Sequence, residues 1–334
     1  MTEKMKTICV GRFLVDVPSQ AEVGLSGEMM DGFDIDTVEE DAVSFHERVA
    51  AREAEITAQG AAAGPTGGGG MVEARDLQVP GMIGRLLIHG RTRSYSMDHG
   101  RRIDDEWVSV EAHAHLDGVS FSLSMQYADM SDGRTAEALL ARLRLRSQNE
   151  IPSVPGFCIW RGVFVEPLPE HTNEHIVFHL GLPGHSDMGL ALSSIAGGNT
   201  DDGLLARVAV TDAESSVDEL LRVTKLRSGK RNINGIDGEE VLERVRELNF
   251  TTGYGFMWEA PGVAGDTLQP NLLLNMETGT NARPGGMPVD SSLHGDAVLS
   301  LWDRISSSIR LRNVAPLAKP VPRDKPATIR RNPV

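Results

Sequence analysis

The run HTNEH at residues 171–175 has the residue types and the spacing of a zinc site. A histidine, two residues and a Glu-His pair match an inverted zinc-protease motif, which would place His171, Glu174 and His175 around one metal ion. His179 follows four residues later. Zinc enzymes of this kind use a helix to bring residues four apart onto one face. The element that carries these side chains therefore decides their chemistry.

The local pattern favours a strand over residues 175–182. The segment HIVFHLGLP is short, contains β-branched and aromatic residues, and ends at a proline. A strand places His175, Val177 and His179 on one face and the four apolar residues Ile176, Phe178, Leu180 and Leu182 on the other. Residues four apart on a strand lie about 13 Å from each other, too far to share one zinc ion. We therefore expect exposed imidazoles, no metal site and no cofactor, with a metal-dependent hydrolase as the alternative.

The candidate nucleophiles have weaker support. In GHSDMG (184–189) one residue too many separates Ser186 from the second glycine of a serine elbow. Cys9 and Cys158 each begin a strand-like run, as repeated core residues would, and a disulfide between them is conceivable in an oxidising compartment. The acidic pair at residues 239–240 is interpreted as the start of an amphipathic helix, where it would complement the helix dipole. We assign no catalytic residue.

Composition limits the class of partner. The chain has 334 residues, more than one hydrophobic core usually serves, so two domains are expected. With 33 basic and 47 acidic residues its formal charge is −14, which disfavours nucleic acid and anionic lipid. No run of about 18 apolar residues is present to span a membrane. A protein partner with a basic surface fits this balance.

An approximate internal duplication is the most informative pattern. CVGRFLVDVP (9–18) and CIWRGVFVEPLP (158–169) share a cysteine, an arginine three residues later, an apolar run, an acid and a proline. VPGMIGRLLI (79–88) and INGIDGEEVL (233–242) share two glycines three apart, and each half closes on a helix-like stretch with an Arg-Leu-Arg ending. Three matches in one order predict two domains of the same construction.

Each half mixes helical and extended patterns, which indicates an α+β fold. Helices are expected at 38–59 and at 215–227, where Ser216 is a candidate N-cap. Strands are expected at 107–115 and 119–127 around an Asp-Gly turn, and in the second half at 175–182, 188–194 and 254–259.

The predicted domain boundaries lie in segments that contain prolines. Two prolines interrupt both periods at 147–156, so we place an N-terminal α+β domain at 1–150 and a C-terminal α+β domain at 151–313. Residues 314–334 are rich in proline and basic residues and are expected to be a disordered tail. The glycine-rich run 60–70 lacks the Lys-Ser/Thr of a phosphate loop and is interpreted as a connector.

Five segments carry a family resemblance: TICVGRFLVDVP, CIWRGVFVEP, INGIDGEEVLERV, YGFMWEAPG and LWDRISSSIRLR. Together they resemble type VI secretion immunity proteins of the group that neutralises lipase effectors of the fourth class. The resemblance implies a non-catalytic protein of two claw-like α+β domains, which grips the lid of a cognate phospholipase and prevents self-intoxication. It also implies a periplasmic location. No export signal precedes the first strand, so a mature or trimmed form is assumed, and a cytoplasmic location stays open.

The contact residues are not transferred, because they change with each cognate effector. Three loops rich in glycine or proline, at 60–71, 183–189 and 279–288, are candidate contact surfaces. A monomer that binds a secreted phospholipase is the expected state. An envelope scaffold or binding module with another protein partner is the remaining alternative.

Overall fold

The computed structural model describes residues 4–63, 69–168, 173–197 and 202–313. Its helices are α1 (Ala42–Ala63), α2 (Asp132–Leu140), α3 (Leu204–Glu214), α4 (Val217–Arg222) and α5 (Gly295–Ser306). Its strands in the first half are β1 (Met5–Val10), β2 (Phe13–Pro18), β3 (Glu22–Met30), β4 (Phe33–Glu39), β5 (Met71–Asp76), β6 (Ile83–Asp98), β7 (Arg101–Leu116), β8 (Val119–Ala128) and β9 (Leu143–Leu145). Those in the second half are β10 (Gly156–Ile159), β11 (Gly162–Val165), β12 (Glu174–Leu182), β13 (His185–Ile195), β14 (Val223–Ile233), β15 (Ile236–Arg246), β16 (Thr252–Ala260), β17 (Asn271–Thr278) and β18 (Arg310–Leu311).

One 12-stranded sheet runs through both halves, in the order β14-β15-β16-β17-β13-β12-β3-β4-β8-β7-β6-β5. Read outward from the centre, each half contributes its strands in the same order. The two central strands, β3 and β12, pair antiparallel and join the halves. This repeated order agrees with the duplication predicted from the sequence, and the two-domain α+β fold is confirmed.

The first hairpin of each half completes the other half. The β1–β2 hairpin pairs with β18, the last strand of the second half, and the β10–β11 hairpin pairs with β9, the last strand of the first half. The matching cysteine motifs and Arg-Leu-Arg endings therefore occupy equivalent places in two three-stranded sheets. Because the hairpins are exchanged, neither half is complete without the other.

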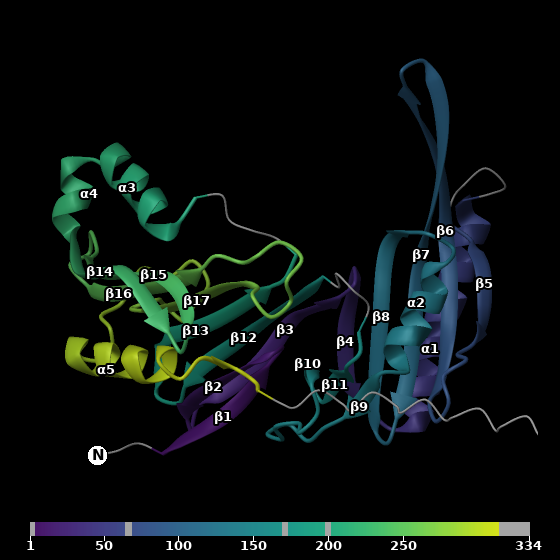
Figure 1. Ribbon diagram of the computed structural model, residues 1–334, viewed down its shortest axis with the longest axis horizontal. Helices are drawn as coiled ribbons and strands as arrows, with labels where there is room; N and C mark the ends of the chain where they lie inside the picture. The colour runs from purple at the N-terminus through teal and green to yellow at the C-terminus, as the bar shows by residue number, and fades with distance from the viewer. Residues whose placement is uncertain (1–3, 64–68, 169–172, 198–201, 314–334) are drawn as a thin grey trace, which may run out of the picture.

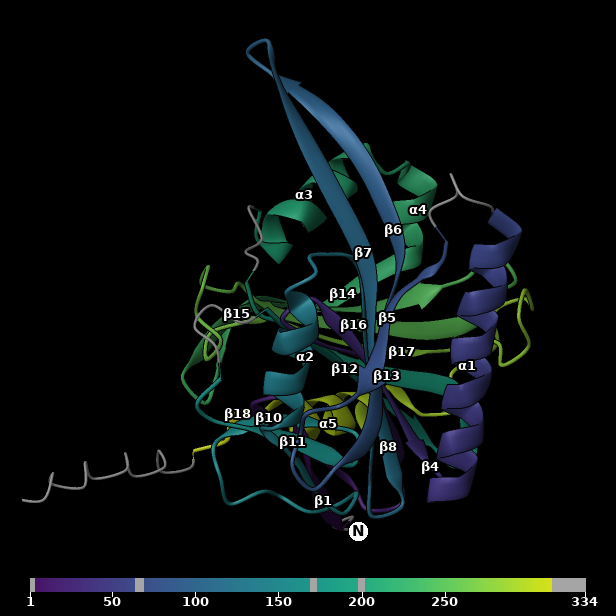
Figure 2. The same ribbon diagram turned by 90° about the vertical axis from the view of Figure 1, so that its right-hand side faces the viewer.

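Helices cover both faces of the large sheet. On the more apolar face, Trp302 of α5 packs edge-on against Phe256, with ring centroids 5.7 Å apart. In the first half, α2 buries Leu139 and Leu140. Each large apolar side chain buried in this manner contributes roughly 1.5–3 kcal/mol relative to exposure. On the opposite face, α1 sets Phe45 against His115 and α3 pairs Arg207 with Glu259. Figure 2 shows α1 and α2 on opposite sides of the first-half strands.

Several predicted elements are confirmed with shifted ends. The helix expected at 38–59 is α1, and the predicted apolar face buries Phe45, Val49 and Ile56. Ser216 caps α4 in a capping box with Glu219. The Asp-Gly turn joins β7 to β8 with both residues at positive φ, as expected.

Two helix predictions were wrong, one in where the helix ends and one in the type of element. The segment 215–227 stops being helical after Arg222, because the next residues pair with β15 as strand β14. Glu239 and Glu240 do not open a helix; they lie in strand β15 between β14 and β16. The alternating pattern of this strand was missed because one of its core-facing residues, Glu240, is charged. Glu240 points into the core and accepts a hydrogen bond from Trp302 Nε1 at 2.7 Å. The predicted tail 314–334 lies outside the described residues.

The two halves stand side by side as lobes, and each sends one extension toward the same side (Figure 1). In the first lobe this extension is the far end of the β6–β7 hairpin, and in the second it is the α3–α4 segment. None of the helices in the described ranges is long and apolar enough to cross a membrane.

Candidate partner interface

The histidine run lies on strand β12, as predicted. Ile176, Phe178 and Leu180 are buried, whereas His175 and His179 lie on the other face, where His179 Nε2 is 2.7 Å from Ser26 Oγ. Burial lowers the pKa of His175, which favours a neutral imidazole. His171 lies outside the described residues. Within the described ranges, no three His, Cys, Asp or Glu side chains converge as metal ligands.

Glu174, the acid of the same motif, has a structural partner that sequence reasoning missed. Its two carboxylate oxygens accept hydrogen bonds from Arg12 at 2.7 and 2.6 Å, and Arg12 also donates to Glu166 at 2.6 Å. Arg12 belongs to the first hairpin and both acids belong to the second half. The ion pair therefore fastens the exchanged hairpin to the second lobe.

Ser186 is not a nucleophile on an elbow. It lies at the start of strand β13, after a turn in which Gly184 has positive φ. No helix follows it, so the geometry of an acyl-transfer serine is absent from this described segment.

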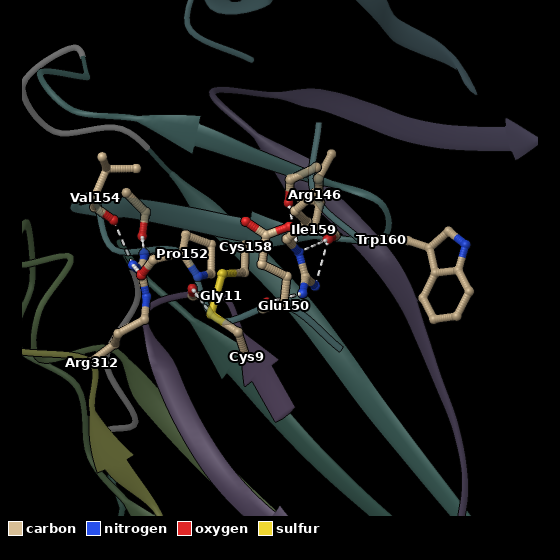
Figure 3. The surroundings of a disulfide bond; sticks show 12 residues. Cys9, Gly11, Arg146, Glu150, Pro152, Val154, Cys158, Ile159, Trp160 and Arg312 are labelled. Atoms are coloured by element: carbon tan, nitrogen blue, oxygen red, sulfur yellow. Dashed lines mark hydrogen bonds between the residues drawn. A yellow bond between two sulfur atoms is a disulfide. The ribbon is translucent and has the colours of Figure 1, made fainter. Parts of the chain in front are cut away.

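Cys9 and Cys158 form a disulfide, which settles a point that the sequence left open. Both are buried, and their Cα atoms are 6.0 Å apart. Beside the bond, Gly11 and Cys158 exchange backbone hydrogen bonds of 3.1 and 2.8 Å (Figure 3). The covalent link thus joins the two exchanged hairpins at the centre of the molecule.

Two arginines hold the segment between the halves, residues 147–156, which we call the connector. Arg312 donates to the carbonyl oxygens of Pro152, Val154 and Gly156, and Arg146 donates to those of Ile159 and Gly162 (Figure 3). Burial lowers the pKa of Arg146 to about 10, because much of its charge is removed from water. The region predicted to be a domain boundary is therefore held in place by hydrogen bonds to buried arginines.

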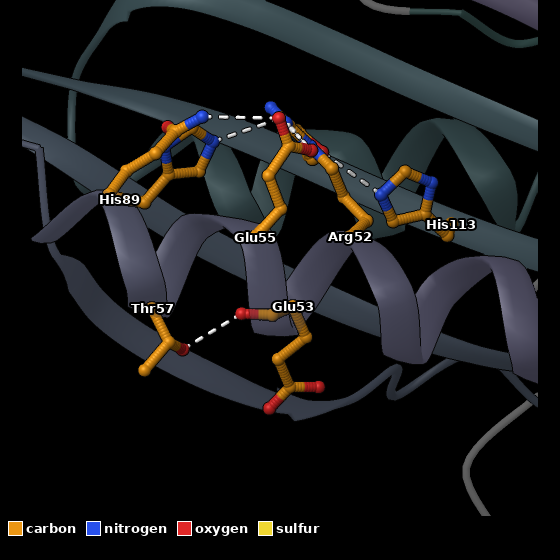
Figure 4. A network of polar contacts seen from close by, with 8 residues as sticks. Arg52, Glu53, Glu55, Thr57, His89 and His113 are labelled. Atoms are coloured by element: carbon orange, nitrogen blue, oxygen red, sulfur yellow. Dashed lines mark hydrogen bonds and ion pairs between the residues drawn. The ribbon is translucent and has the colours of Figure 1, made fainter.

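A polar cluster under α1 resembles a site but supports the fold (Figure 4). Arg52 Nη2 donates to Glu111 at 2.6 Å, and nitrogens of His89 and His113 lie 2.9 and 3.1 Å from the same carboxylate. Burial alone would raise the pKa of Glu111, but hydrogen bonds from His113, His89 and Arg52 outweigh it and hold that pKa well below its usual range. All three partners are engaged with one acid, which attaches the helix to the sheet.

Two of the three predicted contact loops meet where strand β13 begins and strand β17 ends. Thr280 donates its backbone N–H to the Asp187 carbonyl at 3.1 Å, and the Asp187 carboxylate accepts from the N–H groups of Gly279 and Ser292. These bonds join loop 183–189 to loop 279–288. Of the third loop, residues 64–68 lie outside the described part.

The joined loops border two hollows on the sheet face that α5 leaves uncovered. One has a volume of about 510 Å³ and the other about 390 Å³, and Glu277, Thr280 and Asn281 line both. His179, from the histidine run, lines the smaller one. Within the described residues the Glu277 carboxylate has no ion pair, so this polar hollow can receive a basic side chain.

The two lobe extensions expose large apolar side chains. On the β6–β7 hairpin these are Tyr95, Met97, Ile103 and Trp107; on α3, α4 and β14 they are Val210, Val217, Leu220, Leu221 and Leu226. Leu221 is 79% exposed and Val217 is 72% exposed, values that leave their apolar surface without cover in the described structure. Exposed apolar side chains of this size are candidate contacts for a partner protein. Neither extension was predicted from the sequence.

These features define a two-lobed α+β protein whose surface is suited to holding another protein. Two family models match it along its length. The N-terminal domain of Tle cognate immunity protein 4 matches residues 6–153, and the C-terminal domain of the same family matches residues 150–314. The chain belongs to the Tle cognate immunity protein 4 family.

Solved structures show the same fold. The apo immunity protein TplEi of the type VI secretion system (T6SS) from Pseudomonas aeruginosa is 24% identical with a TM-score of 0.74, and covers 93% of this chain and 98% of its own. TplEi complexed with "L" peptide is 23% identical with a TM-score of 0.73, over 92% and 98% of the two chains. A chain of the Tle4–Tli4 complex is 23% identical with a TM-score of 0.76, over 93% and 98%. No curated protein matches the chain.

Proposed function

We propose that this protein binds a cognate type VI secreted phospholipase, holds its lid between the two lobes and so prevents self-intoxication. The observation that carries the proposal is the match of both immunity-family domains, in order, over nearly the whole chain. The Tle4–Tli4 complex is a solved structure of an effector with its immunity protein on this fold. We infer that the protein acts by binding and catalyses no reaction.

A binding mechanism follows from the chemistry of a lid. A lipase lid moves on hinges, and its open form exposes apolar surface. A protein that binds the closed lid more tightly than the open lid shifts the equilibrium by that difference in affinity. Contacts from two lobes can together bury the roughly 1,200–2,000 Å² of a stable complex.

The periplasm is the compartment we propose. The buried Cys9–Cys158 disulfide supports it, because such bonds form and persist in oxidising compartments. A phospholipase that attacks the bilayer from the periplasm would be met there.

The test is association with a candidate type VI secreted phospholipase. Titration of this protein should abolish the hydrolysis of phospholipid vesicles at a one-to-one ratio, and co-expression should remove the toxicity of the enzyme. Leu221→Asp should weaken the complex at least tenfold, whereas Ile151→Asp, an exposed residue of the connector, should leave it unchanged. A lipase that neither binds nor loses activity would exclude the proposal.

A further inference from the structure

The end of the β6–β7 hairpin extends beyond its neighbouring strands. Strand β5 pairs with β6 only as far as His89, and β8 pairs with β7 only from Val108. Between them, residues 92–98 pair with 101–107 and with no other strand in the described structure. This segment, the hairpin arm, stands free in Figure 2. Both of its outer edges therefore present unpaired backbone N–H and C=O groups.

On one face of the hairpin arm, the charged side chains interact with each other. The Arg102 guanidinium lies 4.4 Å from the centre of the Tyr95 ring and donates to Asp104 at 2.7 Å. Arg93 donates to Glu106 at 2.7 Å. Charges on this face are therefore already paired.

On the other face, two charges of β7 have no ion-pair partner among the described residues. Because side chains alternate along a strand, Arg101, Ile103, Asp105 and Trp107 of β7 share this face. Within the described residues Arg101 and Asp105 make no ion pair. Asp98, directly opposite Arg101 in the register, lies 2.6 Å from His99 Nδ1. A cation, an apolar residue and an anion thus stand at successive alternate positions beside a free strand edge.

We propose that the outer edge of β7, over residues 101–107, pairs with an extended segment of the phospholipase, which adds a strand to the hairpin arm. Strand addition uses the unpaired backbone groups for affinity and alternate side chains for specificity. The segment would carry an acid opposite Arg101, an apolar residue opposite Ile103 and a base opposite Asp105. This inference rests on the proposed function and assigns the contact that it leaves open.

The phospholipase suits this edge better than a second copy of the chain. An antiparallel copy would also set Arg101 against Asp105, but each copy carries a charge of −14, which opposes association. Seven paired residues also bury less than a stable interface requires. A partner held between the hairpin arm and the α3–α4 segment gains the missing contacts, because both extensions project to the same side (Figure 1).

The experiment combines charge reversal with amide hydrogen exchange on the full-length protein and a catalytically inactive variant of the phospholipase that it binds. Arg101→Glu and Asp105→Lys should each weaken binding at least tenfold. Arg134→Glu, the same charge change at an exposed position of α2, should change it less than twofold. Amides on the outer edge of residues 101–107 should exchange at least tenfold more slowly in the complex.

The outcomes separate the two proposals. Tight binding with unchanged exchange at residues 101–107 and no effect of either reversal would overturn strand addition and leave the proposed function standing. A dimer of the free protein that dissociates on Arg101→Glu would assign the edge to a second copy instead. If the wild-type protein does not bind the phospholipase, the proposed function fails, and this assignment fails with it.

Discussion

Arg12 is one of the residues that hold the two lobes together at their junction. It is buried with Glu174, and its guanidinium also reaches Glu166. Burial lowers the pKa of Arg12, but hydrogen bonds and charges from Glu174 and Glu166 outweigh this and raise it above its ordinary value. The guanidinium is therefore charged at all working pH values. Arg12 stabilises the fold because it gives the buried Glu174 carboxylate a cationic partner.

Arg12→Ala is expected to destabilise the protein by about 3–5 kcal/mol, because it leaves Glu174 buried without a cation. Chemical denaturation measures the loss. Arg93→Ala removes an exposed pair with Glu106 and serves as the control, with an expected cost below about 1 kcal/mol. Equal losses for the two variants would contradict this account of the junction.

Glu28 gives the protein a specific pH dependence. Burial is the largest influence and raises the pKa of Glu28 to about 7, against the lowering effects of the Trp160 N–H and of Arg146. The folded chain therefore retains a proton that the unfolded chain has lost. Stability should fall as pH rises from about 4.5 to about 7, by on the order of 3 kcal/mol, and then stay level.

Glu28→Gln removes this dependence while keeping an acceptor for the Trp160 N–H. The variant should match the wild type near pH 5 and exceed it above pH 7, as followed by urea denaturation at several pH values. A stability difference that stays constant from pH 5 to pH 8 would show that Glu28 does not titrate in this range.

At the scale of elements, the second glycine of each matched pair, Gly84 in the first half and Gly238 in the second, has the same steric role. A Cβ on Gly84 would lie 2.2 Å from the His113 carbonyl oxygen, and a Cβ on Gly238 would lie 2.6 Å from Trp258 Nε1 and 2.7 Å from the Glu259 carbonyl oxygen. In each half, the glycine lets the strand pass close to its neighbour.

Gly84→Ala and Gly238→Ala should each cost about 1–3 kcal/mol, since backbone or packed aromatic atoms must move. Gly189→Ala is the matched strand control, because nothing lies within 4 Å of its added Cβ. Thermal unfolding of the three variants measures the difference in stability between the two crowded positions and the control. Because alanine is intrinsically favoured over glycine in a strand, a control as unstable as the other two would contradict crowding of the added Cβ as the cause.

The sequence predicted those elements whose own pattern is strong. Strand β12 and the β7–β8 turn were found because Ile176, Phe178 and Leu180 alternate with polar residues and because Asp-Gly marks a hairpin. The exchange of hairpins was not predicted, since β9 and β18 are too short to carry a pattern. The hairpin arm was missed because solvent lies on both of its faces, so no buried residue marks its period.

At the scale of the molecule, the candidate interface depends on the relative placement of two lobes. Strand pairing between β3 and β12, the exchanged hairpins and the disulfide all act at the junction. The extensions lie far from it, so a small change of angle at the junction becomes a large displacement at the hairpin arm. A firm junction keeps both contact surfaces positioned before the partner arrives, which lowers the entropic cost of binding.

The disulfide should contribute about 2–5 kcal/mol to stability, because it closes a long segment between residues 149 positions apart. Cys9→Ala/Cys158→Ala should lower the free energy of unfolding by that amount and still fold, since the hairpins keep their strand partners β9 and β18. Reductant should bring the wild type to the stability of the double variant and leave the variant unchanged. The variant should also bind the phospholipase more weakly, because its lobes are less firmly held. Loss of stability with full retention of affinity would show that strand pairing alone fixes the angle between the lobes.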